Sequence, residues 1–168
     1  NARIISVCNN GKELLIGNGV SADKIDVIFN GLTFSEEQNK ESTIRQELHI
    51  SEDTFVVTTL ARYNVAKGLP FLVESVKALN PNMKIKVLIA GDGELWDEIK
   101  SLIIKEGLED KILQLGFRSD VDNVLNGSDV FVNSAKCYEA LSFAILEALG
   151  RGLPVIATDI GGNSDIIN

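Results

Sequence analysis

The sequence predicts an α/β fold: a Rossmann-like, doubly wound parallel sheet with helices on both faces. From residue 54 onward, five short apolar segments alternate with segments whose apolar residues recur every three or four positions. The apolar segments, such as 55–60, are nearly continuous rather than alternating, which is typical of parallel strands buried on both faces. Because crossovers between parallel strands are right-handed, this order of elements predicts helices on both faces.

The N-terminal residues are predicted to form a different piece of structure. Two predicted strands, 3–7 and 25–29, flank a helix that Asn9 or Asn10 can cap. The turn pair Asn30–Gly31 closes the second strand.

The predicted domain organisation follows from this difference. We expect residues 1–32 to be the tail of an N-terminal domain with the interdomain crossing, and residues 33–168 to be a C-terminal Rossmann-like domain. The chain begins with Asn1 rather than Met and ends at Asn168, where a new helix is predicted to begin. We therefore expect a fragment of a longer protein, truncated at the C-terminal end of this domain.

The elements of the larger domain follow a polar, acidic stretch at 33–42, which is predicted to be a linker or surface loop. They are, in order, a short helix at 43–48, a strand at 55–60, a helix at 69–79, a strand at 85–90, a helix at 95–106, a strand at 112–115, a short helix opened at 119–122, a strand at 129–133, a helix that begins near 141 and a strand at 154–159. Pro70 suits the first turn of its helix, and Ser119 with Asp122 has capping-box spacing.

Composition excludes several functional classes. A net charge of −8 argues against a general nucleic-acid binder, which would normally carry a basic face. The single histidine, His49, removes most histidine-based catalysis and most zinc sites. Two cysteines, Cys8 and Cys137, are too few for a disulfide framework, which favours a reducing compartment. No signal peptide is visible, and no apolar run approaches the roughly 20 residues that span a bilayer.

Two carboxylates mark the segment between the strands at 129–133 and 154–159. Glu139 lies in the loop and Glu147 in the apolar helix that follows it. The positive end of that helix favours an anion such as phosphate, so the carboxylates could hold different parts of one long ligand. Glu147 would suit the two hydroxyls of a ribose, or it could lie on an exposed outer face. Glu139 could contact a sugar or a charged group, or it could be an acid favoured by the helix dipole.

Arg62 and Lys67 follow the first strand of the larger domain, at the edge where open α/β sheets bind ligands. A fixed guanidinium and a mobile ammonium suit a clamp on a diphosphate. The alternative is two solvated charges beside a loop. Gly91 and Gly93 favour a plain tight turn, since they lack the dinucleotide fingerprint and the Walker A pattern. Gly161 and Gly162 could let a head group lie against the backbone, or they could form a turn.

These segments together resemble a known family. The Glu139–Glu147 pair, the stretch 152–158 after it and Arg62 with Lys67–Gly68 before it look like the donor half of retaining GT-B glycosyltransferases of family 4, often called group 1. The matches occur in the family's order over roughly residues 54–168. Residues 27–31 also resemble the family's interdomain crossing.

The resemblance implies a metal-independent, cofactor-free enzyme that moves a sugar from a nucleotide-diphosphate sugar to an acceptor such as a glycan, lipid or polysaccharide precursor, with retention of configuration. The roles it implies are diphosphate binding by Arg62 and Lys67, ribose binding by Glu147, contact with the donor sugar and phosphates by Glu139 and the backbone of Leu141, Ser142 and Phe143, and contact with the base by the backbone at Phe117 and Arg118. It also implies a partner N-terminal acceptor domain, almost wholly absent here, and a cytoplasmic protein that can lie at the inner face of the membrane.

Two departures from the family pattern bear on the site. Ala140–Leu141–Ser142 replaces the family's usual glycine-rich stretch, and Asn133–Ser134 stands where Pro-Ser is common. Without the acceptor domain, we expect this chain to bind nucleotide at best and to transfer no sugar alone.

Two other readings remain open at this stage. A flavodoxin-like or receiver-like binding module would use the same layout of strands, loops and helices, with a cluster of acids at the end of the first strand, where this chain has Arg62. A GT-B-like sugar-nucleotide epimerase would normally use more ionisable groups, including histidine.

Overall fold

The computed structural model describes residues 2–33, 41–137 and 139–167, and its centre is a parallel sheet of five strands in the order β5-β4-β3-β6-β7. The strands are β3 (Phe55–Leu60), β4 (Ile85–Ala90), β5 (Ile112–Gly116), β6 (Val130–Asn133) and β7 (Val155–Ala157). The strand order reverses beside β3, since the chain first moves outward to β4 and β5 and then returns to β6 on the other side. Such a reversal opens a crevice at the carboxyl ends of the strands, here between β3 and β6.

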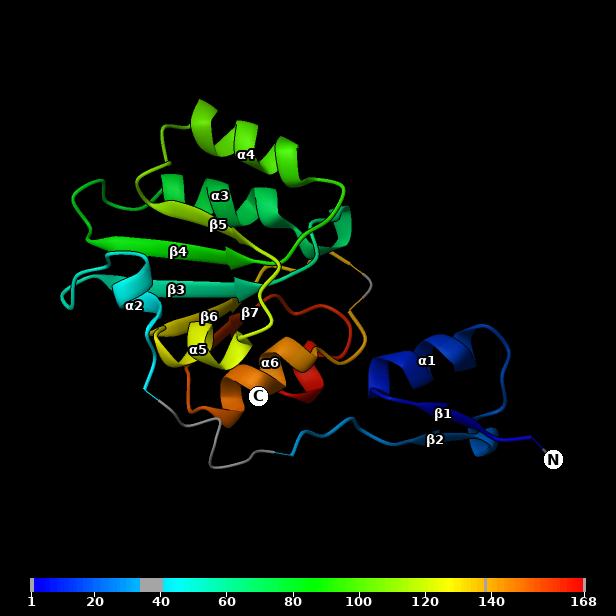
Figure 1. Ribbon diagram of the computed structural model, residues 1–168. Helices are drawn as coiled ribbons and strands as arrows, with labels where there is room; N and C mark the ends of the chain where they lie inside the picture. The colour runs from blue at the N-terminus through cyan, green and yellow to red at the C-terminus, as the bar shows by residue number, and fades with distance from the viewer. Residues whose placement is uncertain (1, 34–40, 138, 168) are drawn as a thin grey trace.

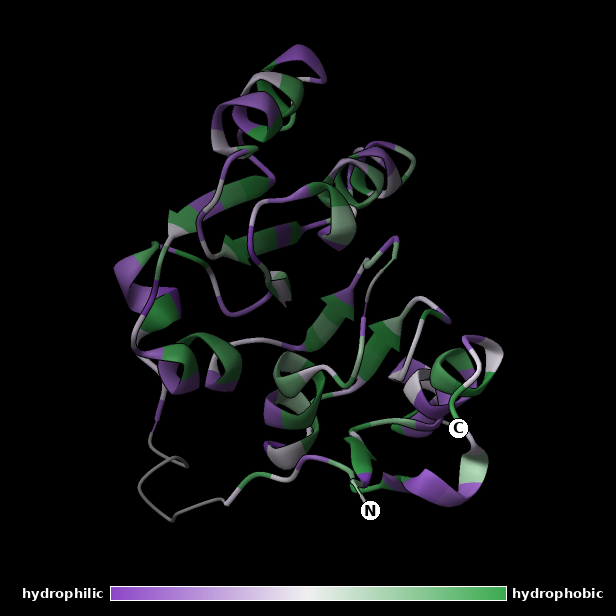
Figure 2. Cartoon of the chain, turned by 90° about the vertical axis from the view of Figure 1, so that its right-hand side faces the viewer, coloured by the Kyte–Doolittle hydropathy of each residue, from purple (hydrophilic) through white to green (hydrophobic). Residues whose placement is uncertain are grey.

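Helices cover both faces of this sheet, which confirms the predicted doubly wound fold (Figure 1). The helices α3 (Leu69–Lys77) and α4 (Trp96–Lys105) lie on one face. The short helix α2 (Ile44–Glu47) and the helices α5 (Val121–Asn126) and α6 (Phe143–Gly150) lie on the other. The strands are coloured mostly as hydrophobic, and hydrophilic residues lie mainly on the helices and loops around them (Figure 2).

The continuous apolar character of the central strands has a direct structural cause. Residues 56–59 of β3 and 87–90 of β4 are all buried, because helices and neighbouring strands cover them on every side. The register pairs Phe55 with Ile85 and Leu60 with Ala90, so both strands end at the same edge. That shared edge places the loops after β3 and β4 next to each other.

The N-terminal residues form a separate two-stranded parallel sheet, β1 (Ile4–Ser6) with β2 (Ile25–Val27), connected by α1 (Asn9–Gly17) and the 3-10 turn η1 (Ala22–Lys24). This N-terminal unit lies beside α6 and the end of the chain (Figure 1). The predicted boundary between residues 32 and 33 falls in the connection to α2, of which 34–40 lie outside the described residues. The assignment to two domains stays a prediction.

Three predicted helix starts differ from the structure. The residue that caps α1 is Cys8, whose Sγ accepts from the Gly11 N–H, rather than Asn9 or Asn10. The helix α5 begins after Asp120 without a side-chain cap, because other groups bind the Asp120 carboxylate. The helix α6 begins two residues later than predicted, at 143.

Candidate functional site

The crevice at the switch point lies between the β3–α3 loop (61–68) and the β6–α6 loop (134–142). Hydrogen bonds hold these loops together: among them, Ser134 Oγ donates to the Lys67 carbonyl at 2.9 Å, and Lys136 N donates to the Ala66 carbonyl at 2.7 Å. The loops come from segments about 70 positions apart, so only the strand order brings them together. The predicted site residues of both loops therefore face a common edge.

An ion pair joins the two loops at that edge. Lys67 Nζ lies 2.6 Å from Glu139 Oε2, and the two side chains are 28% and 8% exposed. A carboxylate that is so little exposed needs a partner to remain charged, and Lys67 supplies it. Two residues that the sequence analysis assigned to one site, from different loops, are thus in direct contact.

Arg62 is an exposed cation without a carboxylate partner among the described residues. The β4–α4 loop packs against the backbone around Arg62. Tyr63 N donates to the Asp92 carbonyl at 2.9 Å, and a Cβ on Gly91 would lie 1.9 Å from the Ala61 carbonyl oxygen. The pair Gly91 and Gly93 therefore allows close packing of the β4–α4 loop against the backbone of Arg62, in addition to forming a turn. The backbone of this loop is therefore fixed, while the Arg62 side chain is exposed.

Gly161 and Gly162 pack against the backbone of the loop that carries Glu139. A Cβ on Gly161 would lie 1.6 Å from the Glu139 carbonyl oxygen, and one on Gly162 would lie 1.7 Å from the Ala140 carbonyl oxygen. Gly162 N also donates to the Glu139 carbonyl at 3.1 Å. These glycines let two segments of the protein approach each other, which the sequence analysis did not foresee; their contact with a ligand stays a prediction.

The start of α6 lies beside this loop. Leu141 and Ser142 are buried, and Phe143 is about half exposed. The Asn133 side chain bridges the end of β6 to the helix start: its Nδ2 donates to Ser142 Oγ at 3.2 Å, and its Oδ1 accepts from Ala135 N at 3.1 Å. Asn133, which departs from the family's usual residue, thus orders the loop. No described side chain caps the helix, so its positive end is available to an anion.

Glu147 lies on the second turn of α6, half-buried, and no described residue forms an ion pair or hydrogen bond with its carboxylate. Burial raises the pKa of the Glu147 carboxyl. The nearby Arg151 does not neutralise it, because its guanidinium pairs with Asp122 and donates to the Glu147 carbonyl at 2.6 Å. The alternative of a solvated acid on the outer face is therefore disfavoured.

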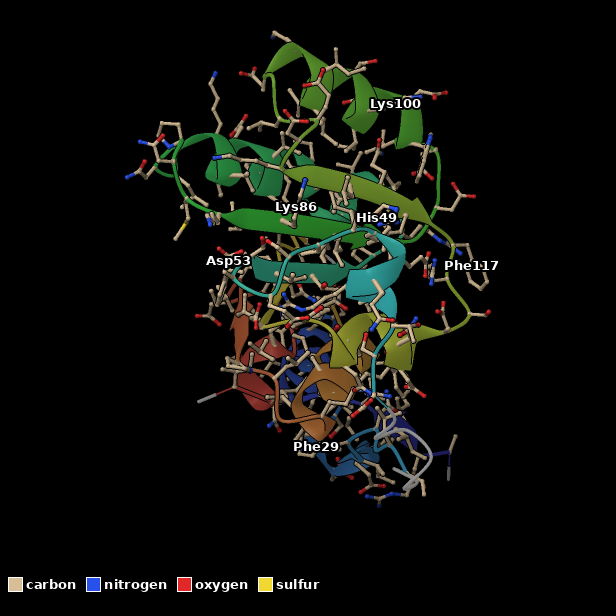
Figure 3. All side chains as sticks on the ribbon, turned by 60° about the vertical axis from the view of Figure 1, so that its left-hand side comes forward. Phe29, His49, Asp53, Lys86, Lys100 and Phe117 are labelled. Atoms are coloured by element: carbon tan, nitrogen blue, oxygen red, sulfur yellow. The ribbon has the colours of Figure 1, made fainter. Side chains whose placement is uncertain are left out.

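Phe117 and Arg118 follow β5, the edge strand, two strands away from β3. Phe117 is 79% exposed and projects at the carboxyl edge of the sheet (Figure 3). Arg118 pairs with Glu47 at 2.6 Å and with Asp120 at 2.7 Å. These bonds raise the pKa of Arg118 and lower the pKa of Asp120 to about 2. The Arg118 guanidinium is thus engaged within the protein, and contact of the backbone here with a base stays a prediction.

The structure also adds residues that the sequence analysis missed. Lys136 is an exposed cation in the β6–α6 loop, with its Nζ 5.8 Å from the centre of the Phe71 ring. Its position directly after the strand at 129–133 was the available signal.

The described residues contain no group of three or more His, Cys, Asp or Glu side chains that could hold a metal ion. No helix in the described part of the chain has the length and apolar character to cross a membrane.

Comparisons with known proteins agree on one family. The family model of glycosyl transferases group 1 matches residues 40–168. The UDP-Gal:alpha-D-GlcNAc-diphosphoundecaprenol alpha-1,3-galactosyltransferase of Escherichia coli is 34% identical, over 98% of this chain and 44% of its own length. The crystal structure of HepE from Anabaena in complex with UDP and glucose has a TM-score of 0.88 at 25% identity, over 99% of this chain and 47% of HepE. A glycosyltransferase from Rickettsia africae has a TM-score of 0.86 at 25% identity, again over 99% of this chain and 47% of that one. This chain therefore spans less than half the length of these relatives.

Proposed function

The chain belongs to the glycosyl transferases group 1 family, of GT-B type, and we propose that it is the donor-binding half of a retaining glycosyltransferase of family 4. The full-length enzyme would move a hexose from a nucleotide-diphosphate sugar to an acceptor without a metal ion. The E. coli relative is named for a UDP-Gal donor, and HepE was crystallised with UDP and glucose. A uridine nucleotide is therefore the first donor to test.

The cations at the crevice fit a departing diphosphate. Sugar transfer of this type develops positive charge on the sugar while negative charge builds on the leaving group. Arg62 can bind two phosphate oxygens at once, and Lys67 can turn toward them as a point charge. Together with the uncapped start of α6, these groups form a fixed positive environment that stabilises the leaving group. Fixed cations of this kind could serve where other transferases use a metal.

The half-buried carboxylate of Glu147 fits a ribose. Two ribose hydroxyls can donate to one carboxylate, as they do to acidic residues in dinucleotide sites. The Glu147 carboxylate has no partner among the described residues and is partly desolvated. A ligand that donates two hydrogen bonds to it offsets the free-energy cost of this desolvation. This role also explains an acid within a helix whose neighbours are Ala, Leu and Ile.

Glu139 is placed to act on both the donor and the cation. In the free protein its carboxylate pairs with Lys67, so an incoming diphosphate has to share Lys67 with this carboxylate or displace it. Its backbone is anchored by Gly162, which keeps the carboxylate beside the place of the leaving group. We assign Glu139 to the donor sugar, with Lys67 and Arg62 on the diphosphate.

The observation that carries the proposal is the contact of Lys67 with Glu139 where the strand order reverses, in the loop that also carries the exposed Arg62. A receiver-like or flavodoxin-like module would instead place acids at the end of β3. Titration calorimetry with UDP, GDP and ADP tests the proposal on this chain. We expect UDP to bind, and Arg62→Ala and Glu147→Ala each to weaken it about tenfold or more, since a charged hydrogen bond contributes about 1.5–3 kcal/mol.

The matched control is Lys100→Ala, which removes an exposed cation on α4, away from the crevice (Figure 3). It should leave UDP affinity unchanged. The proposal is overturned if none of the three nucleotides binds, or if the control variant loses as much UDP affinity as the site variants. Sugar transfer itself has to be measured on the full-length protein, where Glu139→Gln should abolish most activity.

A further inference from the structure

We infer that Asp165 is a positioning residue for Glu139. Asp165 binds the start of α1 and so holds it against the Gly161–Gly162 turn. Asn9 donates to the Asp165 carboxylate twice, from its backbone N to Oδ2 and from its side-chain Nδ2 to Oδ1, both at 2.7 Å. We call this contact the Asn9–Asp165 clasp. It joins the N-terminal unit to the end of the described chain, 156 positions away. Its effect on the donor site depends on the proposed function, but the clasp itself does not.

The clasp has the chemistry of a specific contact. Asp165 ends the 3-10 turn η4 (Asn163–Asp165), and its carboxylate lies at the first residue of α1. A negative charge at the N-terminal end of a helix is stabilised by the helix dipole and by the free N–H groups there. No acidic residue of α1 itself occupies its first turn, so Asp165 supplies this charge from the other part of the chain.

Cys8, the residue before Asn9 of the clasp, packs against Gly162. A Cβ on Gly162 would lie 2.8 Å from the Cys8 Cβ and 1.7 Å from the Ala140 carbonyl oxygen. Gly162 is thus packed between the residue that caps α1 and the loop that carries Glu139. When the clasp holds α1 in place, Cys8 keeps the turn pressed against that loop, and Gly162 N can donate to the Glu139 carbonyl at 3.1 Å.

The contacts continue from Glu139 into the crevice. Its carboxylate pairs with Lys67, whose carbonyl accepts from Ser134 Oγ. Loss of the clasp would loosen the turn, then the Glu139 backbone, and so weaken the hold of Glu139 on Lys67. Because Glu139 competes with a diphosphate for Lys67, a loosened Glu139 should let UDP bind more tightly, as removal of its charge would.

A reciprocal exchange of the two residues tests the clasp. Asp165→Ala removes both acceptors, whereas Asp165→Asn alone would preserve two hydrogen bonds, because the Asn9 amide can turn its oxygen toward the new N–H₂ group. Asn9→Asp sets two carboxylates against each other, which is worse. The double exchange restores both hydrogen bonds, since the new asparagine accepts from the backbone N–H of residue 9 and donates to the new aspartate. The exposed Lys84–Asp53 pair, at the opposite edge of the sheet, supplies the control Asp53→Asn (Figure 3).

Two measurements read the result. Amide hydrogen exchange of Gly162 should become about tenfold faster in Asp165→Ala and in Asn9→Asp, and return to within about twofold in the double exchange. UDP should bind about two- to threefold more tightly in Asp165→Ala, with less than a twofold further change when it is added to Glu139→Gln. Asp53→Asn should change neither quantity.

Unchanged Gly162 exchange in both single variants, or no recovery in the double exchange, overturns the inference. Weaker UDP binding that parallels a loss of melting temperature also overturns it, because that result describes general destabilisation. If the unaltered chain binds none of UDP, GDP and ADP, the proposed function fails, and Gly162 exchange alone still decides whether the clasp holds the turn.

Discussion

Lys67 and Glu139 set the charge of the crevice in the free protein. Their contact at 2.6 Å leaves Arg62 and Lys136 as the cations of the two loops without a carboxylate partner among the described residues. Glu139→Gln should therefore tighten UDP binding about three- to tenfold, because the ammonium of Lys67 is released to the diphosphate. Lys67→Gln should weaken it. Titration calorimetry at two salt concentrations checks this, since the gain should shrink as salt screens the charges. Weaker UDP binding in Glu139→Gln would contradict the competition.

At Glu147, the charged carboxylate that UDP binding requires lowers the stability of the folded protein. Burial raises the pKa of its carboxyl above the ordinary value of 4.5, so between these values the folded protein binds more protons than the unfolded chain. The contribution of Glu147 to stability therefore falls as pH rises through that window. Glu147→Gln should raise the melting temperature at pH 7 by about 1–3 °C while weakening UDP binding.

Thermal unfolding at pH 4 and pH 7 measures this effect. The difference in melting temperature between Glu147→Gln and the unaltered chain should be larger at pH 7 than at pH 4. A lower melting temperature of Glu147→Gln at pH 7 would show that the charged carboxylate has a stabilising partner in the free protein.

At the scale of elements, Gly68 controls how closely the two crevice loops approach. Its φ is +60°, and a Cβ there would lie 2.1 Å from the Ser134 carbonyl oxygen. Gly152 has a similar φ of +72° with nothing within 4 Å of the added Cβ. Both alanine substitutions meet the cost of a left-handed backbone, about 1–2 kcal/mol, but only Gly68→Ala must also separate the loops.

Urea unfolding of the two variants separates these effects. We expect Gly68→Ala to lose at least about 2 kcal/mol more unfolding free energy than Gly152→Ala, and to lose UDP affinity as well. Equal losses in the two variants would mean that the loops can part without cost.

The central elements were predictable from the sequence, while the loop ends were not. The strands predicted at 55–60 and 85–90 are confirmed at both ends, since a continuous apolar run and its burial coincide. The last strand, predicted at 154–159, ends at 157, where Thr158 Oγ1 turns away to donate to the Ala135 carbonyl. The start of α6 moved for a similar reason, because the amide of Asn133 holds the preceding loop.

The candidate site shows the same limit. Strand order alone brings the loops of Arg62, Lys67 and Glu139 to one edge, so their convergence could be predicted. The engagement of Arg118 with Glu47 could not, because it depends on a contact between residues 71 positions apart. Nor could the packing of Gly161 on the Glu139 backbone, since a glycine pattern does not say which backbone will approach it.

At the scale of the whole molecule, the two sheets differ in how much of their surface is buried. The five-stranded sheet has strands of up to six residues with buried interiors. The N-terminal unit has two strands of three residues each, and α1 has no buried residue. Ile5 and Leu14 there are 64% and 67% exposed. A two-stranded sheet with so little burial is marginal in stability unless other structure covers it.

This difference predicts unfolding in two stages. The contacts of the N-terminal unit with the rest of the described chain include those of Asn9 with Asp165 and of Cys8 with Gly162. Because the unit itself buries so little, it can open while the larger domain remains folded. Native-state hydrogen exchange should show the amides of β1 and β2, and Ile28 N directly after β2, which donates to the Ser6 carbonyl, at least about tenfold less protected than those of β3 and β4. Asp165→Ala should lower protection in β1 and β2 further and leave β4 unchanged, because only the smaller unit loses an attachment. Equal protection in both sheets would instead show that the N-terminal unit opens only when the whole molecule unfolds, and that its few contacts are strong enough to make the chain one cooperative body.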